Sequence, residues 1–451
     1  MVSIQQALQI VKDDPIKHLK PQTIDRACRS LGHRWRRRVL GPAAVIHLFI
    51  IQILHHNTAI SHLRHLSPLN FTASAYCQAR ARLPLKVIQQ LVARINRTID
   101  NSCHQSRCRD WCGHRLWRVD GSSVSMPDTP ELQRHFGQPG QQAEGCGFPV
   151  ASILVRVHAK TGLLMDLIAR PLRTHEMSGL LGWHGRLKPG DVVAADRGFC
   201  SYAHLALLLK AQMHGLFRLH QRIIVSFKAH RPYAQQLPKA RRKGKPTSRW
   251  LRRLGFCDQV VQYFKPGKRP VWMSARQYAL LPPHIEVREL RYRICRRGFR
   301  TRQVTLVTTL LDARRYSPRT LAEQYLDRWQ IEVNLRDVKS TLGMEVLRCK
   351  TVDGVMKELW MFMVVYNLVR LVILQAARRQ GVEPDRISFV DALRWLSTGP
   401  PGKGLAMLMV NPLRPGRVEP RVIKRRPKQY KLMNKPRKEL RKKLVQSRLT
   451  A

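Results

Sequence analysis

Three carboxylates stand out in a chain that has few of them. RLWRVDGSSV predicts a strand that ends at Asp120-Gly121, and DVVAADRGF predicts a buried strand that stops at Asp196. Glu332 lies in a stretch with helical patterning. Ligand sites in α/β sheets lie at the carboxyl ends of the strands, where the three side chains can converge. Carboxylates this close repel one another unless cations neutralise them, and oxygen ligands favour Mg²⁺ or Mn²⁺.

Four polar side chains share one face of the helix predicted over residues 325–345. At 100° per residue, a sector of about 60° holds Tyr325, Arg328, Glu332 and Lys339, where a core-facing stripe would be apolar. Each acidic residue also has a structural explanation. Asp before Gly is common in turns, and Glu332 can pair with an arginine on its own helix. Those explanations leave the shared polar stripe unaccounted for.

The charge balance predicts a polyanionic partner. The chain has 451 residues, with 81 Lys and Arg against 29 Asp and Glu, a formal net charge of +52. Such a chain repels itself unless it meets a polyanion, and nucleic acid is the usual one. Two metal ions about 4 Å apart can activate an attacking oxygen and stabilise a leaving oxygen at a phosphodiester. Carboxylates in a basic chain therefore indicate metal-assisted chemistry on nucleic acid.

The spacing of the polar stripe resembles a known signature. Tyr325, Arg328, Glu332 and Lys339 match Y-x2-R-x3-E-x6-K in full, which is the signature of the DDE transposases of the IS-four type of bacterial insertion sequences. VDGSSVSMPDTPEL resembles the first-aspartate segment of that family, and DVVAADRGF resembles the second. The resemblance runs from about residue 70 to 375.

The resemblance implies an α/β fold, with an RNase H-like catalytic core interrupted by a mostly β insertion and a helical N-terminal DNA-binding region. It assigns catalysis and the binding of two Mg²⁺ ions, which Mn²⁺ can replace, to Asp120, Asp196 and Glu332. It assigns contacts with DNA phosphates to Tyr325, Arg328, Lys339 and Arg197. The polar stripe would then face DNA and metal ions instead of a core.

The implied reaction is cut-and-paste transposition of an insertion sequence. The protein would bind the terminal inverted repeats of double-stranded DNA, cut a strand, pass through a hairpin and join the freed end to target DNA. Two ends must be brought together, which predicts a homodimer. Trp272 and Trp250 are candidates for stacking on a flipped base, although a structural role fits each as well. The alternatives are a catalytically silent DNA-binding derivative and a nuclease without strand transfer.

The predicted organisation has five parts. These are a helical DNA-binding region (1–110), the first part of the core (115–221), the insertion (222–302), the rest of the core with the catalytic helix (303–380) and a basic, partly disordered C-terminal region (381–451). A basic C-terminal run of this kind typically adds electrostatic DNA affinity that salt weakens. Arginines near residues 80–97 also allow a helix to lie on DNA, or simply form a solvated face.

No membrane segment and no secretory signal are predicted. The apolar run at 359–374 contains Asn367 and Arg370 and fits a buried helix better than a membrane span. Ten scattered cysteines are typical of reduced thiols, so we expect a cytoplasmic, nucleoid-associated protein. Residues of types that can bind zinc also lie close together in one short segment, but their spacing matches no familiar zinc motif: Cys103, His104, Cys108, Cys112 and His114.

Overall fold

The computed structural model describes residues 19–105, 111–140, 142–294, 303–398, 405–413, 433 and 435–449. Its N-terminal part, from residue 19, is helical. The helices there are α2 (Pro21–Ser30), α3 (Pro42–Leu54), α4 (Ile60–Leu63), α5 (Ala73–Arg82) and α6 (Leu85–Gln105). Pro42 opens α3 at a position where its missing N–H costs nothing, and Thr72 caps α5 by accepting a bond from the Ala75 N–H at 3.1 Å.

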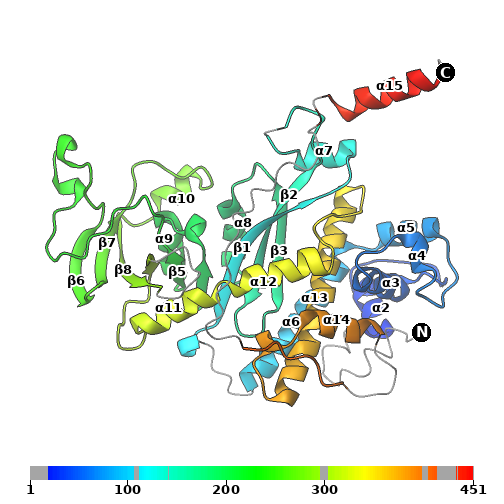
Figure 1. Cartoon of the computed structure of the whole chain (residues 1–451), viewed down its shortest axis with the longest axis horizontal. Coiled ribbons are helices and arrows are strands. Elements are labelled where there is room, and N and C mark those ends of the chain that lie inside the picture. Colours follow the sequence, from blue (N-terminus) through cyan, green and yellow to red (C-terminus); the bar gives the residue numbers. More distant parts are fainter. Residues whose placement is uncertain are drawn as a thin grey trace.

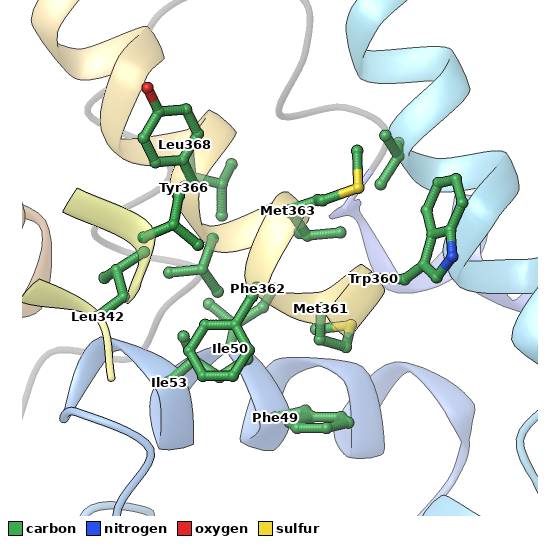
Figure 2. Close-up of a cluster of buried hydrophobic side chains, with 14 of the residues drawn as sticks. Phe49, Ile50, Ile53, Leu342, Trp360, Met361, Phe362, Met363, Tyr366 and Leu368 are labelled. Carbon is green, nitrogen blue, oxygen red and sulfur yellow. The ribbon is translucent and has the colours of Figure 1, made fainter. Parts of the chain in front are cut away.

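One long helix, α13 (Val352–Gln380), joins the N-terminal helices to the rest of the molecule. Figure 2 shows Phe49, Ile50 and Ile53 of α3 beside Met361 and Phe362 of α13, and all five side chains are fully buried. By length and composition α13 is able to cross a membrane, but 89% of its most apolar window is buried inside this protein. It therefore serves as a core helix, which confirms the prediction for residues 359–374.

The polar residues of α13 are satisfied within the core. Asn367 donates to the Leu164 carbonyl at 2.8 Å and accepts from the Leu164 N–H at 2.9 Å. Arg370 donates to the Thr161 carbonyl at 2.9 and 3.1 Å and pairs with Asp385 at 3.1 Å. Burial of polar groups is tolerated when hydrogen bonds replace water, so these residues fix α13 to the sheet.

Nine strands of the described residues form a single sheet, in the order β3-β2-β1-β4-β5-β9-β8-β7-β6. Strands β1, β4 and β5 are parallel, and the remaining pairings are antiparallel. The strands are β1 (Leu116–Ser125), β2 (Val150–His158), β3 (Leu164–Pro171), β4 (Val192–Ala195), β5 (His214–Arg218), β6 (Arg249–Gly255), β7 (Asp258–Phe264), β8 (His284–Arg293) and β9 (Gln303–Thr308). Strands β2 and β3 form an antiparallel hairpin, and β8 pairs antiparallel with β9.

Helices cover both faces of the sheet around β1 and β4. On one face α8 (Glu176–His184) and α9 (Tyr202–Lys210) pack through Met177 and Leu205 against Val193. On the other face α11 (Pro318–Asp327) packs through Leu321 against Leu116 and Ala194. Figure 1 shows α11 and α12 (Gln330–Arg336) running across the sheet. Alternate residues of β4 point to opposite faces, so one short strand supports both layers.

The segment 222–302 extends the same sheet. It contributes β6, β7 and β8 together with the short helix α10 (Ala275–Ala279), and β8 pairs with β9 to continue the sheet from β5. The predicted domain boundaries remain a prediction. The other described helices are α7 (Pro130–Phe136), α14 (Phe389–Thr398) and α15 (Arg437–Leu449), and α15 projects from the body in Figure 1. Residues 399–404 and 414–432 of the predicted C-terminal region lie outside the described residues.

Two predicted elements differ from the structure. Strand β1 continues through Asp120 to Ser125, because β2 pairs with it as far as Ser125 opposite Val150. The single helix predicted over 325–345 is divided: α11 ends at Asp327, α12 begins at Gln330, and a π-helical turn, η6, spans Asp337–Thr341. The hydrogen bonds show why. The N–H groups of Arg328 and Trp329 bond three residues back, and that of Leu342 bonds five residues back.

Candidate active site

The two aspartates occupy equivalent positions in neighbouring parallel strands. The last paired residues of β1 and β4 are Arg118 and Ala194, and Asp120 and Asp196 each lie two residues further on. Neighbouring strands are about 4.8 Å apart, and residues at the same register point to the same face. That face is the one covered by α11 and α12, because Leu116 and Ala194 share it. The sheet therefore brings Asp120 and Asp196 together below these helices.

Backbone N–H groups orient both aspartates. Asp120 Oδ1 accepts from the Gly121 N–H at 2.9 Å, and Asp196 Oδ1 accepts from the Gly198 N–H at 2.8 Å. Asp196 in this way caps the short 3₁₀ turn Arg197–Phe199 that follows β4. The second oxygen of each carboxylate is left to interact with a cation. The glycines that follow the two aspartates thus have a local role in positioning them.

The kinked helix, which consists of α11, α12 and the π-helical turn η6, brings Arg328 and Glu332 to Asp120. Arg328 Nη2 donates to Glu332 Oε1 at 3.0 Å, and Arg328 Nη1 lies 3.6 Å from Asp120 Oδ2. The side chains of Arg328 and Asp120 are 13% and 19% exposed, so the guanidinium is a partly buried cation between two carboxylates. A mid-helix change in hydrogen-bond pattern is common at functional sites, and this one occurs at Arg328.

Lys339 reaches the same part of β1 from the π-helical turn. Its Nζ donates to Ser122 Oγ at 3.0 Å. A cavity of about 380 Å³ is bordered by acidic, basic and hydroxyl side chains from β1 and from the kinked helix: Asp120, Ser122, Glu332, Arg336, Lys339, Ser340 and Glu345. Residues more than two hundred positions apart in sequence thus line one open cavity.

Burial dominates the electrostatics of Asp120. Desolvation raises the pKa of its carboxyl from 3.8 to about 6, although Arg328 and the Gly121 N–H act in the opposite direction. The charges of Asp196 and Glu332 raise this pKa further, because like charges disfavour ionisation of the Asp120 carboxyl. A cation placed among the three carboxylates would reduce the free-energy cost of ionising Asp120.

Tyr325 lies behind Arg328 instead of facing solvent. It is 8% exposed and belongs to the apolar cluster that holds α11 on the sheet. Burial raises the pKa of its phenol to about 12, while Arg328 and Arg218 lower it. The Arg328 guanidinium carbon lies 5.7 Å from the centre of the Tyr325 ring. Tyr325 therefore supports Arg328 in this structure, and its hydroxyl is protonated at neutral pH.

Two charged residues at this end of the sheet were missed from the sequence. Glu176, the first residue of α8, lies against Gly121, and desolvation, with a smaller contribution from the charge of Asp196, raises the pKa of its carboxyl. Arg218 ends β5 and acts electrostatically on Tyr325. A glutamate in the first turn of a helix is ordinary in a sequence. The sequence does not show that Glu176 lies opposite β1, which is the information needed to find it.

The remaining predicted residues have separate surroundings. Arg197 is exposed directly after Asp196. Trp272 borders a cavity of about 390 Å³ that His175 and Tyr202 also line. Trp250 packs on His230 with ring centres 4.3 Å apart.

His114, one of the candidate zinc ligands, is occupied by hydrogen bonds. Both ring nitrogens of His114 already have partners, the Gly190 carbonyl and the Tyr316 hydroxyl, each at 2.6 Å. Cys112 is a free thiol. The side chains of Cys103 and His104, and the whole of Cys108, lie outside the described residues.

The donor chemistry of the carboxylates suits a hard divalent cation. Oxygen ligands from Asp and Glu are those that Mg²⁺ and Mn²⁺ prefer. In the part of the chain that the structure describes, no three His, Cys, Asp or Glu side chains are gathered tightly enough to form a preformed metal cage. Instead, the Arg328 guanidinium lies between Asp120 and Glu332 as a stand-in cation. The residues therefore fit divalent ions, provided that Arg328 exchanges its partners.

Residues 111–368 match the family model described as a transposase DDE domain, which is more than half of the chain. The chain therefore belongs to this family, and within it to the IS4 type. It is 25% identical to transposase InsG for insertion sequence element IS4 of Escherichia coli (strain K12), over 377 residues that cover 79% of this chain and 77% of the relative.

A solved structure is also similar. It is the piggyBac transposase in a synaptic complex with hairpin DNA, with a TM-score of 0.40 and 10% sequence identity over 88% of this chain and 80% of that one.

Proposed function

We propose that this transposase carries out metal-dependent cut-and-paste transposition at Asp120 of β1, where the pairing of β1 with β4 stops. The observation that supports this best is the shared cavity of Asp120, Glu332 and Lys339, beside Asp196 at the equivalent register of β4. The strand order β3-β2-β1-β4-β5, flanked by helices on both faces, supports an RNase H-like core. The strands β6, β7 and β8 then form the insertion between Asp196 and Glu332.

Asp120, Asp196 and Glu332 are the proposed ligands of two Mg²⁺ ions, which Mn²⁺ can replace. Divalent ions held there supply Lewis-acid stabilisation of the charge that develops on phosphoryl oxygens. The Gly121 and Gly198 N–H groups hold one oxygen of each aspartate and so orient the other. Arg328 keeps the carboxylates neutralised before DNA arrives and then turns to a phosphate, for which its planar guanidinium is suited.

Basic side chains of the site bind the DNA backbone in this proposal. Lys339 exchanges the Ser122 hydroxyl for a phosphate oxygen, and exposed Arg197 contacts the strand beside Asp196. Tyr325 is buried, so its contribution is to hold Arg328 in place and to reach a phosphate only through a small movement of α11. Lysine supplies a compact charge, and arginine two parallel hydrogen bonds.

The chemistry proceeds by in-line displacement at phosphorus. Water attacks the phosphodiester at the end of the element, the bond to the 3′ oxygen breaks, and a 3′-OH is released. That hydroxyl attacks a phosphodiester of the opposite strand, which forms a hairpin and releases the 3′ oxygen of the flanking DNA. Water reopens the hairpin, and the freed 3′-OH then attacks a target phosphodiester and displaces its 3′ oxygen. Synapsis of two ends requires a homodimer. The reaction occurs on the chromosome, in the cytoplasm.

Two features support further parts of the proposal. The cavity at Trp272 lies next to His175, one residue from Glu176, so Trp272 is better placed than Trp250 to stack on a base flipped near the cut. A groove of about 920 Å³ in the N-terminal helices is lined by Arg34, Arg36, Arg38 and Arg82, which supports DNA binding by that region.

The test is cleavage of a DNA fragment that carries the flanking ends of the gene. We expect cuts at the element boundary with Mg²⁺, none with EDTA, and none for Glu332→Gln. Hairpin products would support the proposed pathway. Cuts without joining to target DNA would indicate a nuclease. Binding without cleavage in Mg²⁺ and Mn²⁺ would indicate a silent DNA-binding derivative.

A further inference from the structure

The turn after α3 lies against the end of the kinked helix. His56, two residues beyond α3, donates from its ring Nδ1 to the Thr341 carbonyl at 3.1 Å. The same ring packs on Gly343, where an added methyl group would lie 3.4–3.5 Å from three of its atoms. Thr341 is the last residue of the π-helical turn that contains Lys339. An N-terminal side chain therefore contacts the turn that carries a residue of the proposed active site.

The backbone of this turn adopts a conformation that residues with side chains rarely take. The φ angles of His56 and Asn57 are +57° and +49°, so two consecutive residues other than glycine lie in the left-handed region. Such a conformation costs free energy and persists where the surrounding contacts determine it, and functional sites are a common place for it. The contacts that the two side chains make therefore account for the shape of the turn.

Asn57 is bound to the chain that follows the kinked helix. It is 2% exposed, and its Nδ2 donates to Glu358 Oε1 at 2.7 Å. Glu358 of α13 also accepts from the backbone N–H groups of Arg348 and Cys349, at 2.9 Å in both cases. Residues 341–349, the connecting segment, lead from the π-helical turn toward α13. The turn after α3 thus contacts one end of the connecting segment directly and the other end through Glu358.

The connecting segment borders the proposed active site. Glu345 lines the cavity that Asp120 and Lys339 also line, and its carbonyl accepts from the Ser125 N–H at 3.1 Å. The Glu345 N–H donates to the Lys339 carbonyl at 3.1 Å. A displacement of the connecting segment therefore displaces the backbone that carries the Lys339 ammonium.

Helix α3 also reaches the basic groove of the N-terminal helices. Pro42 and Val45, at the start of α3, line that groove, and His56 follows the other end of the helix. A helix of 13 residues spans about 20 Å, so α3 connects the groove to the π-helical turn as one rigid element. A change at the groove can be transmitted to the cavity through α3 and the turn that follows it.

We propose that His56 is a positioning residue, which couples the N-terminal helices to the reaction by holding the π-helical turn. In this arrangement the Lys339 ammonium is placed where it contacts a DNA phosphate beside Asp120. The inference rests on the proposed function. It gives the N-terminal helices a second task beyond DNA binding, which is to set the position of a side chain in the active site.

The inference predicts that His56→Gly separates cleavage from stability. Glycine adopts a φ of +57° without strain, and the ring of His56 is exposed, so the melting temperature is expected to stay at the wild-type value or to rise. Loss of the ring removes both contacts with the connecting segment. The cleavage rate at saturating end DNA is expected to fall about tenfold, while the affinity for the end duplex stays within about threefold.

Gln212→Gly is the matched control. Gln212 has a φ of +55°, is exposed, and lies before β5, at the end of the strand away from the aspartates. This change is expected to leave cleavage at the wild-type rate. A second comparison tests the route of the effect. In a Lys339→Gln background, His56→Gly is expected to reduce cleavage little further, because both changes act through the same ammonium.

The outcomes separate this inference from the proposed function. If His56→Gly cleaves at the wild-type rate while Glu332→Gln is inactive, His56 is not a positioning residue and the proposed function survives. A fall in cleavage that accompanies a lower melting temperature, or that is equally large in the Lys339→Gln background, would also overturn the inference. If the wild-type protein does not cleave its own ends with Mg²⁺, both proposals fail.

Discussion

Two groups of acidic residues in the sheet and its covering helix have different surroundings. In the strands β7 and β8, Arg288 donates to both oxygens of Asp258, at 2.8 and 2.5 Å. The neighbouring Glu289 accepts from Gln259 at 2.8 Å and from Tyr263 at 2.9 Å. Each of these carboxylates has partners for both oxygens, and the ions are almost inaccessible to solvent.

At the proposed active site the carboxylates have fewer partners. Asp120 has one backbone hydrogen bond and an arginine at 3.6 Å, and Glu332 has one arginine at 3.0 Å. An open cavity borders both side chains. Burial of a charge is costly unless it is paired, and this cost applies to Asp120, whose side chain is 19% exposed, more than to Glu332, whose side chain is 36% exposed. The comparison teaches that saturation separates structural acids from functional ones.

The largest expected effect is on cleavage by Asp196→Asn. Loss of one negative charge from the metal site is expected to reduce cleavage on the order of 10³-fold or more, about 4 kcal/mol in the barrier. The amide still accepts from the Gly198 N–H, so the fold is retained. Cleavage rates with the flanking ends and circular dichroism measure the two effects. Cleavage within tenfold of wild type would remove Asp196 from the active site.

The opposite pattern is expected for Arg288→Met. It leaves Asp258 buried and unpaired, which is expected to reduce the free energy of unfolding by roughly 3 kcal/mol. Urea unfolding measures this loss. The protein that remains folded is expected to cleave DNA at the wild-type specific rate, because Arg288 lies in the strands that extend the sheet. A selective loss of cleavage would contradict the structural assignment of this pair.

Asp120→Asn is expected to stabilise the metal-free protein. The pKa of Asp120 is about 6 in the folded state against 3.8, so the folded protein binds more protons between these values. Stability therefore falls as pH rises through that window, and at pH 7 the ionised carboxylate costs about 1–2 kcal/mol after allowance for solvent screening. The amide removes this cost. Thermal unfolding at pH 4 and pH 7 in EDTA measures it.

The expected result is a higher melting temperature for Asp120→Asn at pH 7 and a smaller difference at pH 4. Cleavage would be lost at the same time, so function and stability would move in opposite directions. A lower melting temperature at pH 7 would show that Asp120 is adequately paired by Arg328. The contrast with Asp258 would then be smaller than the hydrogen bonds indicate.

The sequence predicted the parts of the site that depend on local pattern. Helical spacing placed Arg328, Glu332 and Lys339 on one stripe, and strand patterning placed Asp196 after β4. The extent of β1 could not be predicted, since its pairing with β2 beyond Asp120 is non-local. Glu176 was missed for the same reason: only the packing of α8 brings it to Gly121. The kink at Arg328 depends on hydrogen-bond registers that a constant 100° period cannot represent.

The smallest expected effect concerns Lys339. If it binds one phosphate, Lys339→Gln is expected to weaken end binding only a few-fold and to reduce the dependence of log affinity on log salt by about 0.9. Fluorescence anisotropy with the end duplex at several salt concentrations measures this slope.

Ser122→Ala supplies the matched control, because it removes the 3.0 Å hydrogen bond from Lys339 and leaves the charge in place. Its salt slope is expected to equal that of the wild-type protein, whereas a purely positional role for Lys339 would give the two variants the same phenotype. An unchanged slope in Lys339→Gln would mean that the ammonium serves Ser122 and β1 alone. In that case Lys339 would belong with Asp258 and Arg288 among the residues that hold the sheet together.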